Sequence, residues 1–196
     1  MGVLRLKMST DPHWVKNVVE KNIKEILIDH AWCEQKAASS AISLMVQFPE
    51  ETEIVKHMSE LVQEEMDHFR RVHDLIIERG WTLEKEKKDN YVNELLKFTL
   101  KGGDRKAHLV EKLLIGALIE ARSCERFRVL SENVEDKKLA EFYRELMESE
   151  AAHYTMFITL ARSVKPREYV DQRWMEWLEY EDSVIQNYGK SESIHG

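Results

Sequence analysis

The sequence has few glycines and prolines, which break helices, and few cysteines, which form disulfides. Of its 196 residues, seven are glycine and three are proline, which favours long helices over an all-β or disordered chain. Two cysteines, Cys33 and Cys124, are too few for a disulfide framework, and we expect them to be buried thiols. The chain has neither an apolar run long enough to cross a bilayer nor a secretory signal at its start. We therefore expect a cytoplasmic protein with no membrane partner.

An excess of positive charge is also missing. The formal net charge of −7 argues against a strongly basic nucleic-acid-binding protein, although a local basic face is compatible with it. The content of hydrophobic residues, 43%, and the length suit one sizeable core. We expect a single domain, residues 1–196, with an ordered core from about residue 12 to 188. The sequence indicates no particular oligomeric state.

Proline, glycine and capping residues divide the chain into helical segments. Asp11 and Pro12 suit the start of a helix, Pro49 interrupts one, and Gly80 suits the end of one. No alternation of apolar and polar residues between turns predicts a strand. We expect an all-α fold of four long helices with additional short and C-terminal helices. The expected helical segments are 11–48 (one helix or two), 50–79, 91–101, 105–130, 136–164 and 166–188.

Two Glu-x-x-His pairs interrupt the apolar faces of long helices. They are Glu65 with His68, and Glu150 with His153. A single such pair on a glutamate-rich helix is most often a solvated ion pair. Here, each pair lies in mid-helix within a row of apolar residues spaced three and four apart, which predicts that both pairs are buried.

Each pair is matched by an inward-facing glutamate about thirty residues upstream, Glu34 for the first pair and Glu120 for the second. In an antiparallel hairpin, residues at equal distances from the turn meet. Glu34 and the first pair are centred near Pro49, and Glu120 and the second pair are centred near residues 135–136. Glu125 is displaced from this register and lies on a more polar face, so we prefer Glu120. Asp29 and His30, one turn before Glu34, suit either a supporting contact to a ligand or simple packing.

Four buried carboxylates are unfavourable unless positive charge lies among them. Two divalent cations would neutralise them, and a glutamate from two helices with Glu-x-x-His from two others is the ligand set of four-helix carboxylate proteins with two iron or manganese ions. Iron with O₂ is the default chemistry for such ligands. We expect no catalytic group beyond the metal ligands and no other cofactor site. The predicted ligands are Glu34, Glu65, His68, Glu120, Glu150 and His153.

Two longer motifs carry a resemblance to a known family. ILIDHAWCEQKAA (residues 26–38) and GALIEARSCERF (116–127), together with the two Glu-x-x-His pairs, resemble the tRNA 2-methylthio-N6-isopentenyladenosine hydroxylase family, a MiaE-like branch of the ferritin-like superfamily. The resemblance covers nearly the whole chain, and the six predicted ligands match the family's pattern. It implies a ferritin-like four-helix bundle and a di-iron monooxygenase that hydroxylates the isopentenyl group of this tRNA base. It also implies two iron ions, O₂, and an electron-transfer reductant.

Other functions are compatible with such a bundle. The first alternative is a ferritin-like ferroxidase or iron-binding protein; a purely structural bundle is the plainest. A rubrerythrin-like peroxidase is disfavoured because the chain has no Cys-x-x-Cys pair. Contact with the tRNA phosphates would need a basic face, for which the candidates are Lys85, Lys87, Lys88, Lys97, Lys101, Arg105, Lys106, Arg162, Lys165, Arg167 and Arg173.

Overall fold

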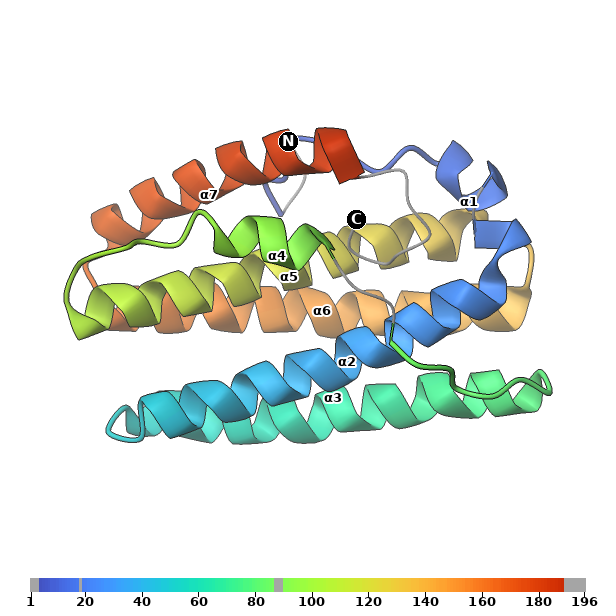
Figure 1. Ribbon diagram of the computed structural model, residues 1–196, viewed down its shortest axis with the longest axis horizontal. Coiled ribbons are helices and arrows are strands. Elements are labelled where there is room, and N and C mark those ends of the chain that lie inside the picture. Colours follow the sequence, from blue (N-terminus) through green and yellow to red (C-terminus); the bar gives the residue numbers. More distant parts are fainter. Residues whose placement is uncertain (1–3, 18, 87–89, 189–196) are drawn as a thin grey trace. The chain divides into compact units, whose positions relative to one another are not determined.

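The computed structural model describes residues 4–17, 19–86 and 90–188, and within these residues it consists of helices and loops without strands (Figure 1). None of these helices has an apolar stretch that would reach across a membrane. The helices form two compact units. The prediction of a single domain stays a prediction. In chain order the elements are α1 (His13–Asn17), η1 (Val19–Lys21), α2 (Ile23–Gln47), α3 (Thr52–Glu78), α4 (Asn90–Leu96), α5 (Arg105–Asn133), α6 (Lys137–Val164) and α7 (Arg167–Tyr188).

The smaller unit is the hairpin of α2 and α3, whose two helices run antiparallel on either side of the turn at Pro49. The apolar rows that the two helices turn toward each other are mostly buried, including Ala31 on α2 and Leu61 on α3, while Met45 near the end of α2 is only partly buried. Gly80 ends the hairpin with a φ of 73°, a left-handed conformation that costs glycine little. This confirms the predicted end of the second helix.

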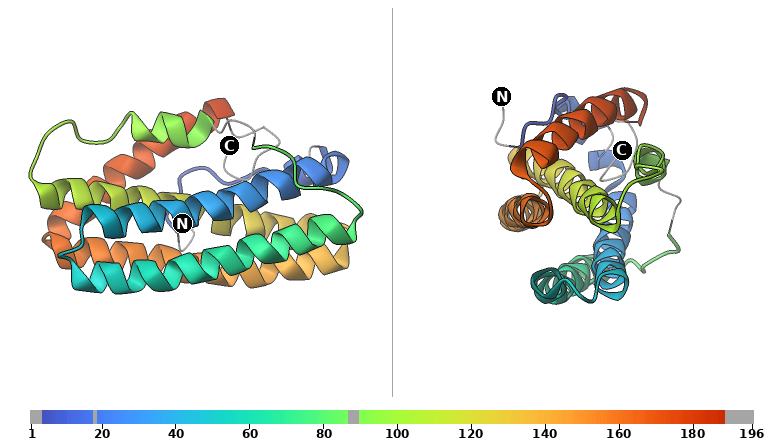
Figure 2. Two further views of the ribbon diagram at one scale, coloured as in Figure 1. Left: turned by 60° about the horizontal axis from the view of Figure 1, so that its bottom comes forward. Right: turned by 90° about the vertical axis from the view of Figure 1, so that its left-hand side faces the viewer.

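The larger unit is built on the antiparallel pair α5 and α6, with α1, η1, α4 and α7 packed around it. The right-hand view of Figure 2 shows α7 leaving the end of α6 and crossing α5. Trp174 and Trp177 of α7 are buried and lie on its packing face, whereas Met175 between them is exposed. The N-terminal segment from residue 4 belongs to the same unit.

Capping residues fix the starts of α5 and α6. Asp104 accepts a hydrogen bond from the backbone N–H of Ala107 at 2.7 Å, and Asp136 accepts one from that of Leu139 at 3.1 Å. Each satisfies one of the backbone donors that the first turn of a helix leaves without an intrahelical acceptor. Asp11 acts similarly at α1, where it accepts from the N–H of His13 at 2.9 Å.

Two helix ends differ from the sequence prediction. The short helix α4 ends at Leu96 and not at Lys101, because the backbone groups that follow form tertiary hydrogen bonds. Arg173 donates to the carbonyl oxygen of Phe98, and Glu111 accepts from the N–H of Leu100. Conversely, α5 continues to Asn133, three residues beyond the predicted end at residue 130. The turn between α5 and α6 is correspondingly shorter than the predicted 131–136.

Candidate metal centre

The α2–α3 hairpin brings three of the predicted ligands together. The ligand atoms of Glu34, Glu65 and His68 all lie within 4.8 Å of one another, and all three side chains are buried. His68 Nδ1 lies 3.6 Å from a carboxylate oxygen of each glutamate. The spacing of three in Glu-x-x-His places both side chains on one face of α3, and α2 supplies Glu34 at the matching depth.

His30, one turn before Glu34, is fully buried and forms a supporting contact. Its Nε2 lies 2.6 Å from Glu34 Oε1. Burial by itself would raise the pKa of the Glu34 carboxyl, but the hydrogen bond with His30 and the nearby imidazole of His68 hold that pKa well below its ordinary value. Glu34 is therefore held as a carboxylate, the form that binds a metal ion. The sequence left the role of His30 open between supporting contact and packing, and this geometry favours the supporting contact.

The α5–α6 pair brings together the other three predicted ligands. The ligand atoms of Glu120, Glu150 and His153 lie within 4.8 Å of one another in a buried position. His153 Nδ1 lies 3.4 Å from Glu150 Oε2. The larger unit thus repeats the arrangement of the smaller one, with one glutamate on the first helix and a Glu-x-x-His pair on the second.

Close helix packing sets the spacing beside this second trio. Gly116 on α5, one turn before Glu120, faces the ring of Phe157, one turn after His153 on α6. A Cβ atom at residue 116 would lie 2.9 Å from two ring carbons of Phe157. Only glycine permits this approach. The glycine therefore lets the two helices that carry Glu120 and His153 come close to each other.

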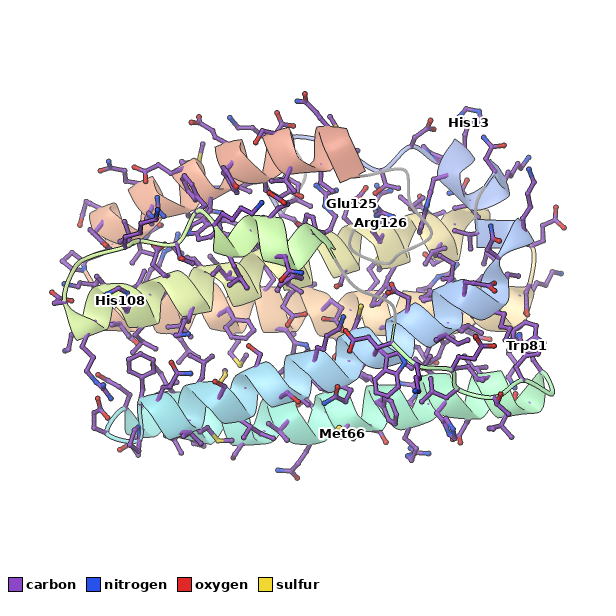
Figure 3. All side chains as sticks on the ribbon, in the orientation of Figure 1. His13, Met66, Trp81, His108, Glu125 and Arg126 are labelled. Atoms are coloured by element: carbon purple, nitrogen blue, oxygen red, sulfur yellow. The ribbon has the colours of Figure 1, made fainter. Side chains whose placement is uncertain are left out.

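Glu125 lies on a different face of α5 from Glu120 and has other partners. Its carboxylate accepts hydrogen bonds from the N–H and the hydroxyl of Thr10 at 2.9 and 2.5 Å and lies 3.3 Å from Arg122. Figure 3 shows Glu125 and the adjacent Arg126 on the side of α5 toward α7. This arrangement agrees with the choice of Glu120 over Glu125 as a ligand, although Glu125 is buried and not on a polar surface.

Buried ion pairs of the larger unit were missed by the sequence analysis. Arg122 donates through Nε and Nη2 to Glu181 at 2.9 and 2.6 Å, and the hydroxyl of Tyr91 donates to the same carboxylate at 3.1 Å. Arg173, a candidate for phosphate contact, is buried and bonded to Glu111 at 2.7 and 2.8 Å. These pairs join helices that are far apart in the sequence, and no local pattern indicates such pairing.

Both trios have the donor chemistry of a metal site. Carboxylate oxygens with imidazole nitrogens suit Fe²⁺ or Mn²⁺, and antiparallel helices that bury one glutamate and one Glu-x-x-His pair are typical of ferritin-like carboxylate metalloproteins. Within that class, the chain belongs to the family described as tRNA-(MS[2]IO[6]A)-hydroxylase (MiaE), which it matches over residues 3–196.

Individual relatives agree with this assignment. The chain is 36% identical over 154 residues to the tRNA 2-(methylsulfanyl)-N(6)-isopentenyladenosine(37) hydroxylase of Pseudomonas putida, covering 79% of this chain and 73% of that protein. It is 34% identical over 116 residues to the hydroxylase of the same name from Salmonella typhimurium, covering 57% of this chain and 40% of that protein. The family predicted from the sequence motifs is thereby confirmed.

A solved structure shares the fold. A Synechococcus protein described as having aldehyde deformylating oxygenase activity matches with a TM-score of 0.90 and 32% sequence identity, over 97% of this chain and 95% of that one. The predicted fold class, all-α and ferritin-like with additional short and C-terminal helices, is confirmed by this likeness.

Proposed function

We propose that this chain is an O₂-dependent hydroxylase of the isopentenyl group of 2-methylthio-N6-isopentenyladenosine in tRNA. Family membership over residues 3–196 carries the proposal. The two buried trios support it, because a reaction that activates O₂ at a metal centre needs carboxylate and imidazole ligands shielded from bulk water. As a tRNA-modifying enzyme, the protein acts in the cytoplasm.

The six predicted ligands would hold two iron ions. Four carboxylates carry a charge of −4 and two neutral imidazoles add none, so two Fe²⁺ ions give a neutral centre. Membership of the family and the repeated trio support the full set, Glu34, Glu65, His68, Glu120, Glu150 and His153. When bound, the two ions would supply Lewis acidity and pass electrons from the reductant to O₂.

The chain's own residues prepare this centre. The hydrogen bond with His30 and the nearby imidazole of His68 hold Glu34 ionised. Leu61 and Val72 lie one turn before Glu65 and one turn after His68, and because both are buried they exclude water beside the first trio. Phe157 has the same position beside the second trio. These contacts keep the ligand side chains in place before substrate arrives.

Hydroxylation also requires partners. One oxygen atom of O₂ enters a C–H bond of the isopentenyl group, and the other leaves as water with two protons and two electrons. An external reductant, an electron-transfer protein or its chemical substitute, supplies those electrons. The tRNA supplies the base from a single-stranded loop, where the isopentenyl group is accessible without opening a duplex.

The test is a single turnover under ¹⁸O₂. Protein loaded with iron and chemically reduced is mixed with an anticodon stem-loop bearing 2-methylthio-N6-isopentenyladenosine, and the nucleosides are analysed by mass spectrometry. We expect one hydroxylated nucleoside carrying one ¹⁸O atom. Repeated absence of label, with ferric mineral accumulating instead, contradicts the proposal and favours the ferroxidase alternative.

Aldehyde deformylation is a second candidate activity. The likeness to the Synechococcus protein, at 32% identity over 97% of this chain, favours testing it. The same reduced protein, given O₂ and a long-chain aldehyde, is analysed for formate and for the shortened hydrocarbon. We expect no formate above the level of a protein-free control. If formate is produced and no labelled nucleoside is found, aldehyde deformylation becomes the preferred activity and tRNA hydroxylation the alternative.

A further inference from the structure

A second polar site lies in the larger unit, on the side of α6 away from the trio. The cavity has a volume of about 240 Å³ and is lined by α6, α7 and the N-terminal segment. An α-helix turns by about 100° per residue, so Arg162 lies roughly opposite His153 around the axis of α6. Three arginines line the cavity, namely Arg5, Arg162 and Arg167.

One carboxylate orients two of these arginines. Arg162 donates through Nε and Nη2 to Asp171 Oδ1 at 2.9 and 2.6 Å, and Arg167 donates through Nε to Asp171 Oδ2 at 3.3 Å. Both guanidinium groups keep further N–H donors beyond these bonds. Three arginines against one aspartate leave a formal excess of two positive charges at the cavity.

Arg5 brings the third positive charge. Among the described residues, no carboxylate forms an ion pair with it, and its side chain is exposed. Its backbone has a φ of 59°, in the left-handed region that a residue with a side chain seldom occupies. A strained residue at a cavity wall is a recurrent feature of binding sites.

The cavity also has an aromatic wall. Tyr154 and the buried Trp174 both line it. The ring of Tyr154 lies 5.9 Å from that of Trp174, centroid to centroid. The two rings give the cavity an apolar surface beside the positive charge of its arginines.

We propose that this cavity binds a phosphodiester group of the RNA substrate, an inference that rests on the proposed function. Guanidinium groups match the geometry of phosphate oxygens, and a cavity of this volume holds a phosphate with adjoining ribose atoms but not a whole drug-sized ligand. The net charge of −7 repels nucleic acid in general. A local excess of positive charge is therefore where the RNA backbone approaches.

The experiment measures the affinity for tRNA as a function of salt. The variant Arg5→Gln/Arg167→Gln removes two charges while leaving the Arg162–Asp171 pair intact, and neither side chain is buried, so the fold is not at risk. We expect at least about a fivefold loss of affinity and a fall of roughly one to two in the slope of log K against log salt concentration. Arg5→Lys/Arg167→Lys keeps both charges and should retain most of the slope.

A matched control lies on the same helix. Arg144 is exposed on α6, outside the cavity, and Arg144→Gln removes one positive charge there. We expect this variant to bind tRNA with unchanged affinity and slope. If the double variant binds tRNA as tightly as the wild type does, the phosphodiester site is wrong while the proposed function stands.

Two further outcomes separate the possible sources of phosphate and the two proposals. In one outcome, inorganic phosphate displaces tRNA only at the ionic strength at which sodium chloride also displaces it. This result supports a phosphodiester site. Competition by micromolar inorganic phosphate, lost in the double variant, identifies a site for free phosphate and overturns the proposal. Wild-type protein that neither binds tRNA nor labels its base under ¹⁸O₂ contradicts both the site and the proposed function.

Discussion

At the scale of single residues, the carboxylates of this protein differ in what holds their charge. Glu34 is paired with two imidazoles, while Glu181 and Glu125 are paired with the guanidinium group of Arg122. A neutral histidine can itself bind a metal ion beside its glutamate. Arginine stays charged and keeps its carboxylate in an ion pair. The partner of each buried glutamate therefore distinguishes a metal ligand from a structural ion pair.

Substitution of Glu120 and of Glu125 tests this distinction. Glu120→Gln removes a ligand and should lower the iron content of purified protein by at least about half, because a neutral amide binds iron weakly. Glu125→Gln should keep the iron and lower the stability by about 1–3 kcal/mol, because Arg122 and Thr10 lose a charged acceptor. Metal analysis and urea unfolding measure the two effects. The reverse pattern of iron content contradicts the ligand assignment.

Cys124 gives a prediction that depends on pH. Burial, with the nearby Glu150 and Glu125, raises the pKa of its thiol to about 12. Because the thiolate is the reactive form and is populated only as the pH approaches that value, native metal-free protein at pH 8.5 should leave Cys124 unalkylated by iodoacetamide. Protein unfolded in urea should be alkylated within minutes. Mass analysis of the Cys124 peptide measures the extent of alkylation in both samples. Rapid labelling of Cys124 in native protein argues against the buried position.

At the scale of helices and their contacts, the closest approach of α5 and α6 is at Gly116. In an exposed helix, Gly→Ala stabilises by about 1 kcal/mol. Here the added Cβ atom would lie 2.9 Å from the ring of Phe157, which is buried at 4% exposure. The cost of overpacking, about 1–3 kcal/mol, therefore exceeds the gain in helix propensity.

We expect Gly116→Ala to lower the free energy of unfolding in urea. The companion variant Phe157→Leu removes the ring edge, so in the double variant Gly116→Ala should cost less than it does alone. Gly102→Ala is the control, because a Cβ atom there would meet nothing within 4 Å. Additive effects of the Gly116 and Phe157 substitutions would show that the two residues do not interact.

Periodicity predicted the long helices and the depth of the site residues, because these depend on residues three and four apart on one helix. Glu65 and His68 were predicted to be buried on this basis, and they are. The end of α4 and the pairing of Arg173 with Glu111 were not predicted, since both depend on residues more than ten positions apart. The pairing of His30 with Glu34 was one of two open alternatives, because spacing alone does not separate a hydrogen bond from packing.

At the scale of the whole molecule, each of the two units carries one trio of two glutamates and one histidine. Each trio alone offers two negative charges for one divalent ion. Metal-free protein retains these carboxylates in buried positions, where like charges repel and desolvation is costly. Bound metal relieves both costs, so metal binding adds directly to the free energy of folding.

Removal of metal should therefore lower the melting temperature of the protein. A ligand present at one hundred times its dissociation constant stabilises the folded state by about 2.7 kcal/mol, which corresponds to a shift of roughly 5–10 °C for a chain of this length. Calorimetry of chelated protein, before and after addition of Fe²⁺ without O₂, measures the shift. Glu65→Gln/Glu150→Gln removes one ligand from each trio and should melt at the same temperature with and without Fe²⁺. If thorough chelation leaves both the metal content and the melting temperature of the wild-type protein unchanged, the buried glutamates and histidines do not form a metal centre.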